Sequence, residues 1–91
     1  MAFLINEDGT KQDFELPRHG SQLERLRPVQ VALKGYAEVM ELADGGVVMT
    51  NEDGLAMELA DNRVASEMIG RRLVGPILVC TVDEVRAWDA A

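Results

Sequence analysis

Short apolar segments separated by glycine-containing polar turns constrain this fold more than any other feature of the sequence. One turn sequence, Asn-Glu-Asp-Gly, occurs at residues 6–9 and again at 51–54, and Ala-Asp-Gly-Gly occupies residues 43–46. Glycine and asparagine accept the left-handed backbone of tight turns, so shared turn chemistry explains the repeat without a duplication. Segments joined this tightly pair as antiparallel strands, because parallel strands need crossovers of about a dozen residues.

The apolar pattern between the turns places the strands. The expected strands cover residues 2–5, 11–16, 36–42, 47–50, 55–59 and 77–81. The first two predict an opening hairpin, and the next three predict an antiparallel meander. In the last strand of the meander, Leu55, Met57 and Leu59 share one face. The final strand is apolar on both faces, which is typical of a central strand.

Capping boxes, in which a serine or threonine precedes a glutamate by three residues, place the helices. Ser21 and Glu24 form the first box and predict a helix start. The apolar residues spaced for one face of this helix are Leu23, Leu26, Val29 and Leu33. Because Pro28 intrudes, we expect a break or kink near Arg27 and a second helix with Pro28 in its first turn, stopped by Gly35.

The second half of the chain carries weaker helix signals. Residues 61–68 predict a polar loop or one or two helical turns, ended by Gly70. Thr81 and Glu84 form the second capping box, so a short C-terminal helix should follow, with Val85 and Trp88 on its inner face.

Together these elements predict an α+β fold in a single domain over residues 1–91. We expect a small antiparallel β-sheet of five to six strands, one main helix on one face and a short C-terminal helix. The residues expected in the core are Leu26, Val29, Leu33, Phe3, Ile5, Val48, Leu55, Met57, Leu78 and Cys80. Several unpaired strand edges in so small a domain favour a homo-oligomer.

Charge and cysteine content exclude some functions. Sixteen acidic against nine basic residues give a net charge of −7, so we expect no direct nucleic-acid binding. The acidity predicts either plain solubility or mimicry of a nucleic acid towards a basic partner. Cys80, the only cysteine, lies in an apolar run and predicts a buried thiol. Lacking a membrane-spanning segment or a signal sequence, the chain is expected in the cytoplasm, the host's if phage-encoded, without a membrane partner.

Motifs for catalysis or metal binding are missing. His19 is the single histidine, and of the two serines Ser21 is explained as a helix cap. The Asn-Glu-Asp-Gly turns lack the alternating oxygen ligands of a calcium loop, and one histidine with one distant cysteine does not make a zinc site. We therefore expect a protein that is not an enzyme, with no catalytic residue, no metal and no cofactor.

Two groups of arginines stand out in so acidic a chain. The candidate ligand- or partner-binding residues are Asn62, Arg63, Arg71, Arg72, Arg25 and Arg27. Guanidinium forks suit phosphate or carboxylate, and Gly70 and Gly75 let the backbone approach a ligand. The alternatives are ion pairs with the surplus acids for the arginines, and a helix cap for Asn62.

Four motifs, taken in order, are similar to those of a known family. They are Leu-Lys-Gly-Tyr-Ala-Glu-Val at 33–39, Asn-Glu-Asp-Gly at 51–54, Asn-Arg-Val-Ala at 62–65 and Val-Gly-Pro-Ile-Leu-Val at 74–79. This order resembles an uncharacterised domain-of-unknown-function family of short phage, plasmid and bacterial proteins. The resemblance extends from Phe3 to Val79 and implies a small α+β domain on a mobile element, with no stated activity. The chain departs from the pattern at Lys34, where glycine is common, and at Pro28.

Two functional hypotheses follow. The first is a non-enzymatic accessory protein of a phage or mobile element that binds and modulates a host protein through its acidic surface, as an anti-defence inhibitor. The second is an oligomeric sponge for a small anionic, nucleotide-type ligand, held by Arg63, Arg71 and Arg72. An orphan hydrolase is a third possibility, which the missing nucleophile motifs disfavour.

Overall fold

A computed structural model describes residues 2–90 and shows a five-stranded antiparallel sheet with three helices among them. The elements, in chain order, are β1 (Phe3–Ile5), β2 (Lys11–Asp13), α1 (Gln22–Leu33), β3 (Ala37–Glu41), β4 (Gly46–Asn51), α2 (Arg63–Ile69), β5 (Ile77–Thr81) and α3 (Val82–Ala90). This confirms the predicted small α+β fold. The helical alternative for the segment before Gly70 is the correct one, since α2 occupies it.

The strand order across the sheet is β2-β1-β5-β4-β3. β5 lies in the centre, as its apolar sequence predicts, and its first two residues, Ile77 and Leu78, are fully buried. Leu78 pairs with Leu4 of β1 on one side and with Met49 of β4 on the other. β2 and β3 are therefore the two edges of the sheet.

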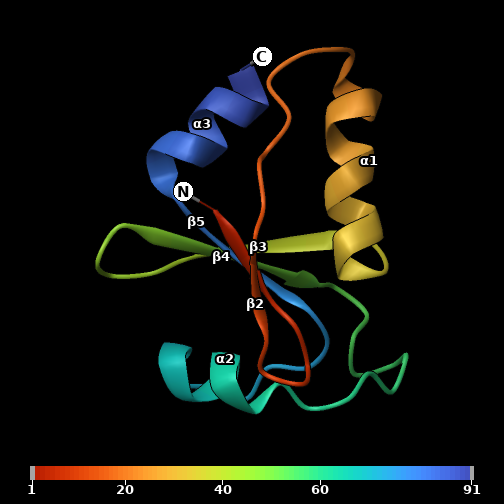
Figure 1. The fold of residues 1–91 in the computed structure, drawn as a ribbon, viewed down its shortest axis with the longest axis vertical. Coiled ribbons are helices and arrows are strands. Elements are labelled where there is room, and N and C mark those ends of the chain that lie inside the picture. The colour runs from red at the N-terminus through yellow and green to blue at the C-terminus, as the bar shows by residue number, and fades with distance from the viewer. Residues whose placement is uncertain (1, 91) are drawn as a thin grey trace.

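The helices cover both faces of the sheet, as Figure 1 shows, with α1 and α3 on one side and α2 at the opposite end of the view. The buried cluster under α1 and α3 comprises Ala2, Leu4, Leu16, Val29, Leu33, Val47, Met49, Leu78 and Cys80. The cluster beside α2 comprises Ile5, Val48, Ala65, Leu73 and Ile77. Alternate residues of β4 and β5 supply the two clusters, because successive strand side chains point to opposite faces.

The first capping box forms as predicted. Ser21 Oγ accepts from the backbone N–H of Glu24 at 3.2 Å, and Glu24 Oε1 accepts from the N–H of Ser21 at 3.2 Å. The expected break is wrong, because α1 continues through Pro28 to Leu33. Pro28 and Glu24 are both exposed, so water can reach the Glu24 carbonyl that the proline leaves without a donor.

Helix α1 ends one residue earlier than predicted. Lys34, not Gly35, adopts the left-handed conformation that closes the helix, with φ 65°. At Gly35 a side chain is excluded by a steric clash, since a Cβ there would lie 2.8 Å from Nδ2 of Asn51.

The strand predicted at 55–59 does not form. Residues 52–58 wind through turns, in which the N–H of Met57 donates to the Asp53 carbonyl at 2.8 Å and that of Leu59 to the Gly54 carbonyl at 3.0 Å. The preceding strand, β4, is already flanked by β3 and β5, so it has no free edge for a third partner. Leu55, predicted in the core, is consequently 69% exposed.

The rest of the predicted core divides into two groups. Those buried as predicted are Ile5, Val29, Leu33, Val48, Leu78 and Cys80. Phe3 and Leu26 are half-buried, and Met57 is exposed with the turn that carries it. In α3, Val85 and Trp88 pack against the core as predicted. Over residues 2–90, no helix has the length and apolar character needed to cross a membrane.

Candidate functional site

The two arginines that follow α2 lie on one hollow. Gly70 ends the helix with φ 86°, and Arg71 and Arg72 come directly after it. Both line a hollow of about 410 Å³, together with Gly54 and the buried Leu73. Arg63, the first residue of α2, is exposed and lies outside this hollow.

The hollow carries charged groups of both signs. Arg72 Nε donates to Asp61 Oδ1 at 2.9 Å, in a pair whose side chains are largely exposed. Arg71 Nη1 lies 3.3 Å from Sδ of Met40. The acidic residues of the lining are Glu38, Glu52 and Asp53. A bound anion would meet these carboxylates as well as the guanidinium groups, so the hollow suits a ligand or partner that carries both charges.

Asn62 is fully buried and has a structural role. Its Nδ2 donates to the carbonyls of Ile5 and Gly75, both at 2.9 Å, and its Oδ1 accepts from the N–H of Ala65 at 3.1 Å. Its backbone N–H donates to the Leu73 carbonyl at 2.9 Å. The side chain caps α2 and ties it to β1, which agrees with the helix-cap alternative and leaves no exposed amide for a ligand.

Arg25 and Arg27 belong to a different part of the molecule. Arg25 is only 8% exposed and its Nη1 donates to the Trp88 carbonyl, while Trp88 Nε1 donates to the Arg25 carbonyl at 3.0 Å. This reciprocal pair joins α1 to the last turn of α3, where a cation also complements the helix dipole. Arg27 is exposed on α1. Since α1 and α2 cover opposite faces (Figure 1), the two arginine groups do not form one site.

The outer face of α1 is unusually apolar. Leu23 is 59% exposed and Val31 is 71% exposed. Arg27 lies midway between them, so the three residues share one helix face at four-residue intervals. With Glu24 and Pro28 they line a shallow hollow of about 640 Å³. These five residues are called the α1 outer patch below.

Sequence reasoning missed this patch because it placed Leu23 on the same apolar stripe of the helix as Val29 and Leu33. The residues of α1 that are buried are Arg25, Val29 and Leu33. An arginine can occupy a buried position because its aliphatic stem packs like an apolar side chain while its head group finds a polar partner. One feature of the sequence could have predicted the patch. Leu23, Arg27 and Val31 form a second row along the helix, and a helix that buries only one face gains no stability from apolar residues in such a row.

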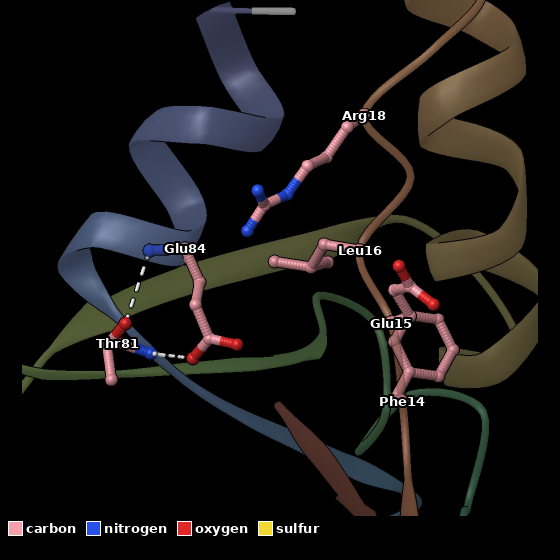
Figure 2. Close-up of a pocket in the computed structure, with 6 residues that line it drawn as sticks. All are labelled: Phe14, Glu15, Leu16, Arg18, Thr81 and Glu84. Atoms are coloured by element: carbon pink, nitrogen blue, oxygen red, sulfur yellow. Dashed lines mark hydrogen bonds between the residues drawn. The ribbon is translucent and has the colours of Figure 1, made fainter. Parts of the chain in front are cut away.

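A cleft of about 420 Å³ lies between residues 14–18 and the start of α3 (Figure 2). Its lining consists of Phe14, Glu15, Leu16, Arg18, Thr81 and Glu84. The Arg18 side chain extends towards α3, whereas the Glu84 carboxylate turns to Thr81. The N–H of Thr81 donates to Glu84 Oε1 at 2.9 Å and the N–H of Glu84 donates to Thr81 Oγ1 at 3.2 Å, which confirms the second capping box.

The Glu84 carboxylate serves this cap. Burial raises the pKa of Glu84, but the donors of Thr81 and the N–H of Ala2 outweigh burial, so the pKa lies below its ordinary value. The cleft therefore offers the ionised, hydrogen-bonded carboxylate of Glu84 together with the exposed Glu15 and Arg18.

The possible nucleophiles are engaged or inert. Burial, with a smaller contribution from Glu84, raises the pKa of Cys80 to about 11, so its thiol is protonated at neutral pH. Ser66 Oγ donates to the Asn62 carbonyl at 2.6 Å and accepts from the N–H of Leu73 at 2.8 Å. Within residues 2–90, no group of three His, Cys, Asp or Glu side chains is arranged to hold a metal ion.

Comparisons of the chain with protein-family models, with curated proteins and with solved structures find no match. The resemblance to the family of short phage, plasmid and bacterial proteins therefore stays a prediction.

Proposed function

We propose that the protein is a non-enzymatic accessory protein of a phage or mobile element, which binds a host protein and modulates it as an anti-defence inhibitor. The observation that supports binding is the α1 outer patch, where Leu23 and Val31 are each more than half exposed on one helix face. Exposed apolar side chains gathered beside charged ones on one surface are a feature of interaction sites. The mobile-element origin extends from the sequence resemblance, and the anti-defence role is a hypothesis that rests on that origin and on the acidic surface.

The spacing of the patch suits a helix that docks into a groove. Leu23, Arg27 and Val31 recur every four residues, and eight residues of helix span about 12 Å at a rise of about 1.5 Å per residue. Full burial of a leucine or valine side chain is worth about 1.5–3 kcal/mol. Because Leu23 is 59% exposed and Val31 is 71% exposed, burial of the exposed parts of both side chains would supply about 2–4 kcal/mol, enough to decide whether a modest complex forms.

The charges of the patch and of the whole chain indicate which surface charges the partner should carry. Arg27 lies between the two apolar anchors, so the partner's groove should carry a carboxylate on one wall. The chain as a whole carries a net charge of −7, which attracts a partner whose surface is basic around that groove. A nucleic-acid-processing enzyme of the host has such a basic surface and fits the anti-defence proposal.

The test compares three tagged proteins in host lysate: the wild type, the double variant Leu23→Ser/Val31→Ser, and Met68→Ser as a matched control. Met68 is 51% exposed on α2, away from the patch. We expect the wild type and the control to retain the same protein, and the double variant to bind that purified protein more than about tenfold more weakly in calorimetry. A failure to retain any partner, or equal affinity for all three proteins, would contradict the proposal.

A second candidate function is the sponge for a nucleotide-type anion. It is favoured by the shared hollow of Arg71 and Arg72, and disfavoured by the acidic residues and the Arg72–Asp61 pair described above. Calorimetry with cyclic and linear nucleotides tests it. Binding that disappears in Arg71→Ala/Arg72→Ala would establish the sponge, whereas no binding, or binding unchanged in that variant, rules it out.

A further inference from the structure

The two edges of the sheet differ in how well they resist pairing. β2 is three residues long, and its residues Lys11, Gln12 and Asp13 are all exposed. β3 is five residues long and places Val39, which is 51% exposed, between Glu38 and Met40. Short, charged edge strands discourage added strands, whereas a longer edge with an exposed β-branched residue is open to them. β3 is thus the edge at which another strand would add.

Hydrogen bonds at both ends of the β3–β4 ladder show which backbone groups of β3 are open. The N–H of Leu42 donates to the Gly46 carbonyl, and the N–H of Glu52 donates to the Tyr36 carbonyl, both at 2.8 Å. Because an antiparallel ladder alternates every second residue, the even-numbered residues of β3 bond β4. The residues whose N–H and C=O groups point to the open edge are therefore Ala37, Val39 and Glu41.

We propose that two copies of this chain pair along β3 and form a two-fold symmetric dimer with one continuous sheet. A symmetric antiparallel ladder centred on Val39 sets it opposite the partner subunit's Val39, and sets Ala37 opposite the partner's Glu41. Each of these pairs exchanges two backbone hydrogen bonds. The exposed Val39 side chains then cover each other, since both lie on the α1 side of the sheet, as Ala37 does.

The same register provides charge complementarity on the α2 side of the sheet. Glu38 of one copy lies opposite the partner's Met40, with Cβ atoms about 5 Å apart. Arg71 Nη1 lies 3.3 Å from Sδ of Met40 in the same chain, so each Glu38 carboxylate comes beside an arginine of the other copy. Within residues 2–90 of one chain, Arg71 has no carboxylate at ion-pair distance. In the dimer, Arg71 would pair with the carboxylate of the partner's Glu38. The two-fold axis makes this ion pair occur twice.

This dimer goes beyond the proposed binding to a host protein and can be tested without one. Analytical ultracentrifugation of the wild type should give twice the chain mass of 10.0 kDa. Val39→Lys sets two positive charges opposite each other at the centre of the ladder between the two copies, so this variant should be a monomer. Met68→Lys introduces the same charge at an apolar residue of α2 that is as exposed as Val39, at 51%, and this variant should remain a dimer. Circular dichroism and thermal melts verify that both variants fold.

A charge exchange tests the register. Glu38→Arg sets two arginines together and Arg71→Glu sets two glutamates together, so each should raise the dimer dissociation constant about tenfold or more. The double variant Glu38→Arg/Arg71→Glu should restore most of the wild-type affinity. A wild type that stays monomeric at about 100 µM, a folded Val39→Lys that stays dimeric, or a double variant as weak as the single ones would each overturn the proposal.

Discussion

Replacement of Asn62 by alanine should remove much of the stability of this fold. The variant loses the α2 cap, worth about 1 kcal/mol, and the two bonds that Nδ2 donates to the carbonyls of Ile5 and Gly75. Each lost bond costs about 1 kcal/mol. The buried Gly75 carbonyl, left without a donor, costs about a further 0.5–1 kcal/mol, whereas the Ile5 carbonyl keeps its place in the ladder between β1 and β5. The sum is about 3.5–4 kcal/mol, against about 5–14 kcal/mol expected for 91 residues.

Urea unfolding followed by the fluorescence of Trp88 and by circular dichroism measures this loss. With a slope of about 1–1.5 kcal/mol per molar urea, the midpoint should fall by about 2–4 M. Asn6→Ala is the matched control, because the Asn6 side-chain bonds to Thr10 and Gln12 are exposed and should be worth under about 1 kcal/mol. A loss below about 1.5 kcal/mol in Asn62→Ala would refute the reasoning.

Asn62→Asp separates the cap from the bridging bonds. The introduced carboxyl keeps an acceptor for Ala65, but when ionised it faces the carbonyls of Ile5 and Gly75 with no donor. Burial and those carbonyls should raise its pKa in the folded state, so this variant should be most stable at low pH and lose stability as pH rises through that pKa. Urea midpoints that do not fall between pH 4 and 8, relative to the wild type, would contradict this.

Three further predictions concern other sites. Cys80, with its pKa raised to about 11, should react with a thiol reagent at pH 8 about a hundredfold more slowly in the folded than in the urea-unfolded protein; equal rates would contradict its burial. Glu84 has a lowered pKa, so its contribution to stability is present at neutral pH and lost on acidification; urea midpoints of Glu84→Gln should change less between pH 6 and pH 3 than those of the wild type. Pro28→Ala gives the Glu24 carbonyl a donor and should stabilise the protein by about 1–3 kcal/mol in the same assay, whereas destabilisation would argue against one continuous α1.

Elements set by contacts between near neighbours were predictable from the sequence. The Ser21–Glu24 and Thr81–Glu84 boxes each span three residues, so their donors and acceptors meet once the first turn of helix forms. The central place of β5 followed from residues apolar on both faces, because only a strand covered on both sides can bury them. These features depend on the local chain and on burial alone.

The sequence near a segment could not predict its structure where the segment could pack in two different ways. Leu55 and Met57 alternate like a strand, yet a strand needs a free edge, and β4 had none to offer. Leu23 fits the apolar spacing of α1, yet the helix rotates to bury Arg25, whose guanidinium finds the Trp88 carbonyl across the fold. In each case a residue far along the chain decided the outcome.

The candidate binding residues were likewise predictable only in part from the sequence. Arginines in an acidic chain can be recognised from composition, but whether they meet depends on which face of the sheet each helix covers, and here α1 and α2 cover different faces. The sequence by itself determined the opening hairpin, the central strand β5, the two helix starts marked by capping boxes and the net negative charge. Only the tertiary structure decided that Asn62 is buried, that Leu23 and Val31 face outwards and that β3 forms an edge, because burial and edge position are properties of the assembled sheet.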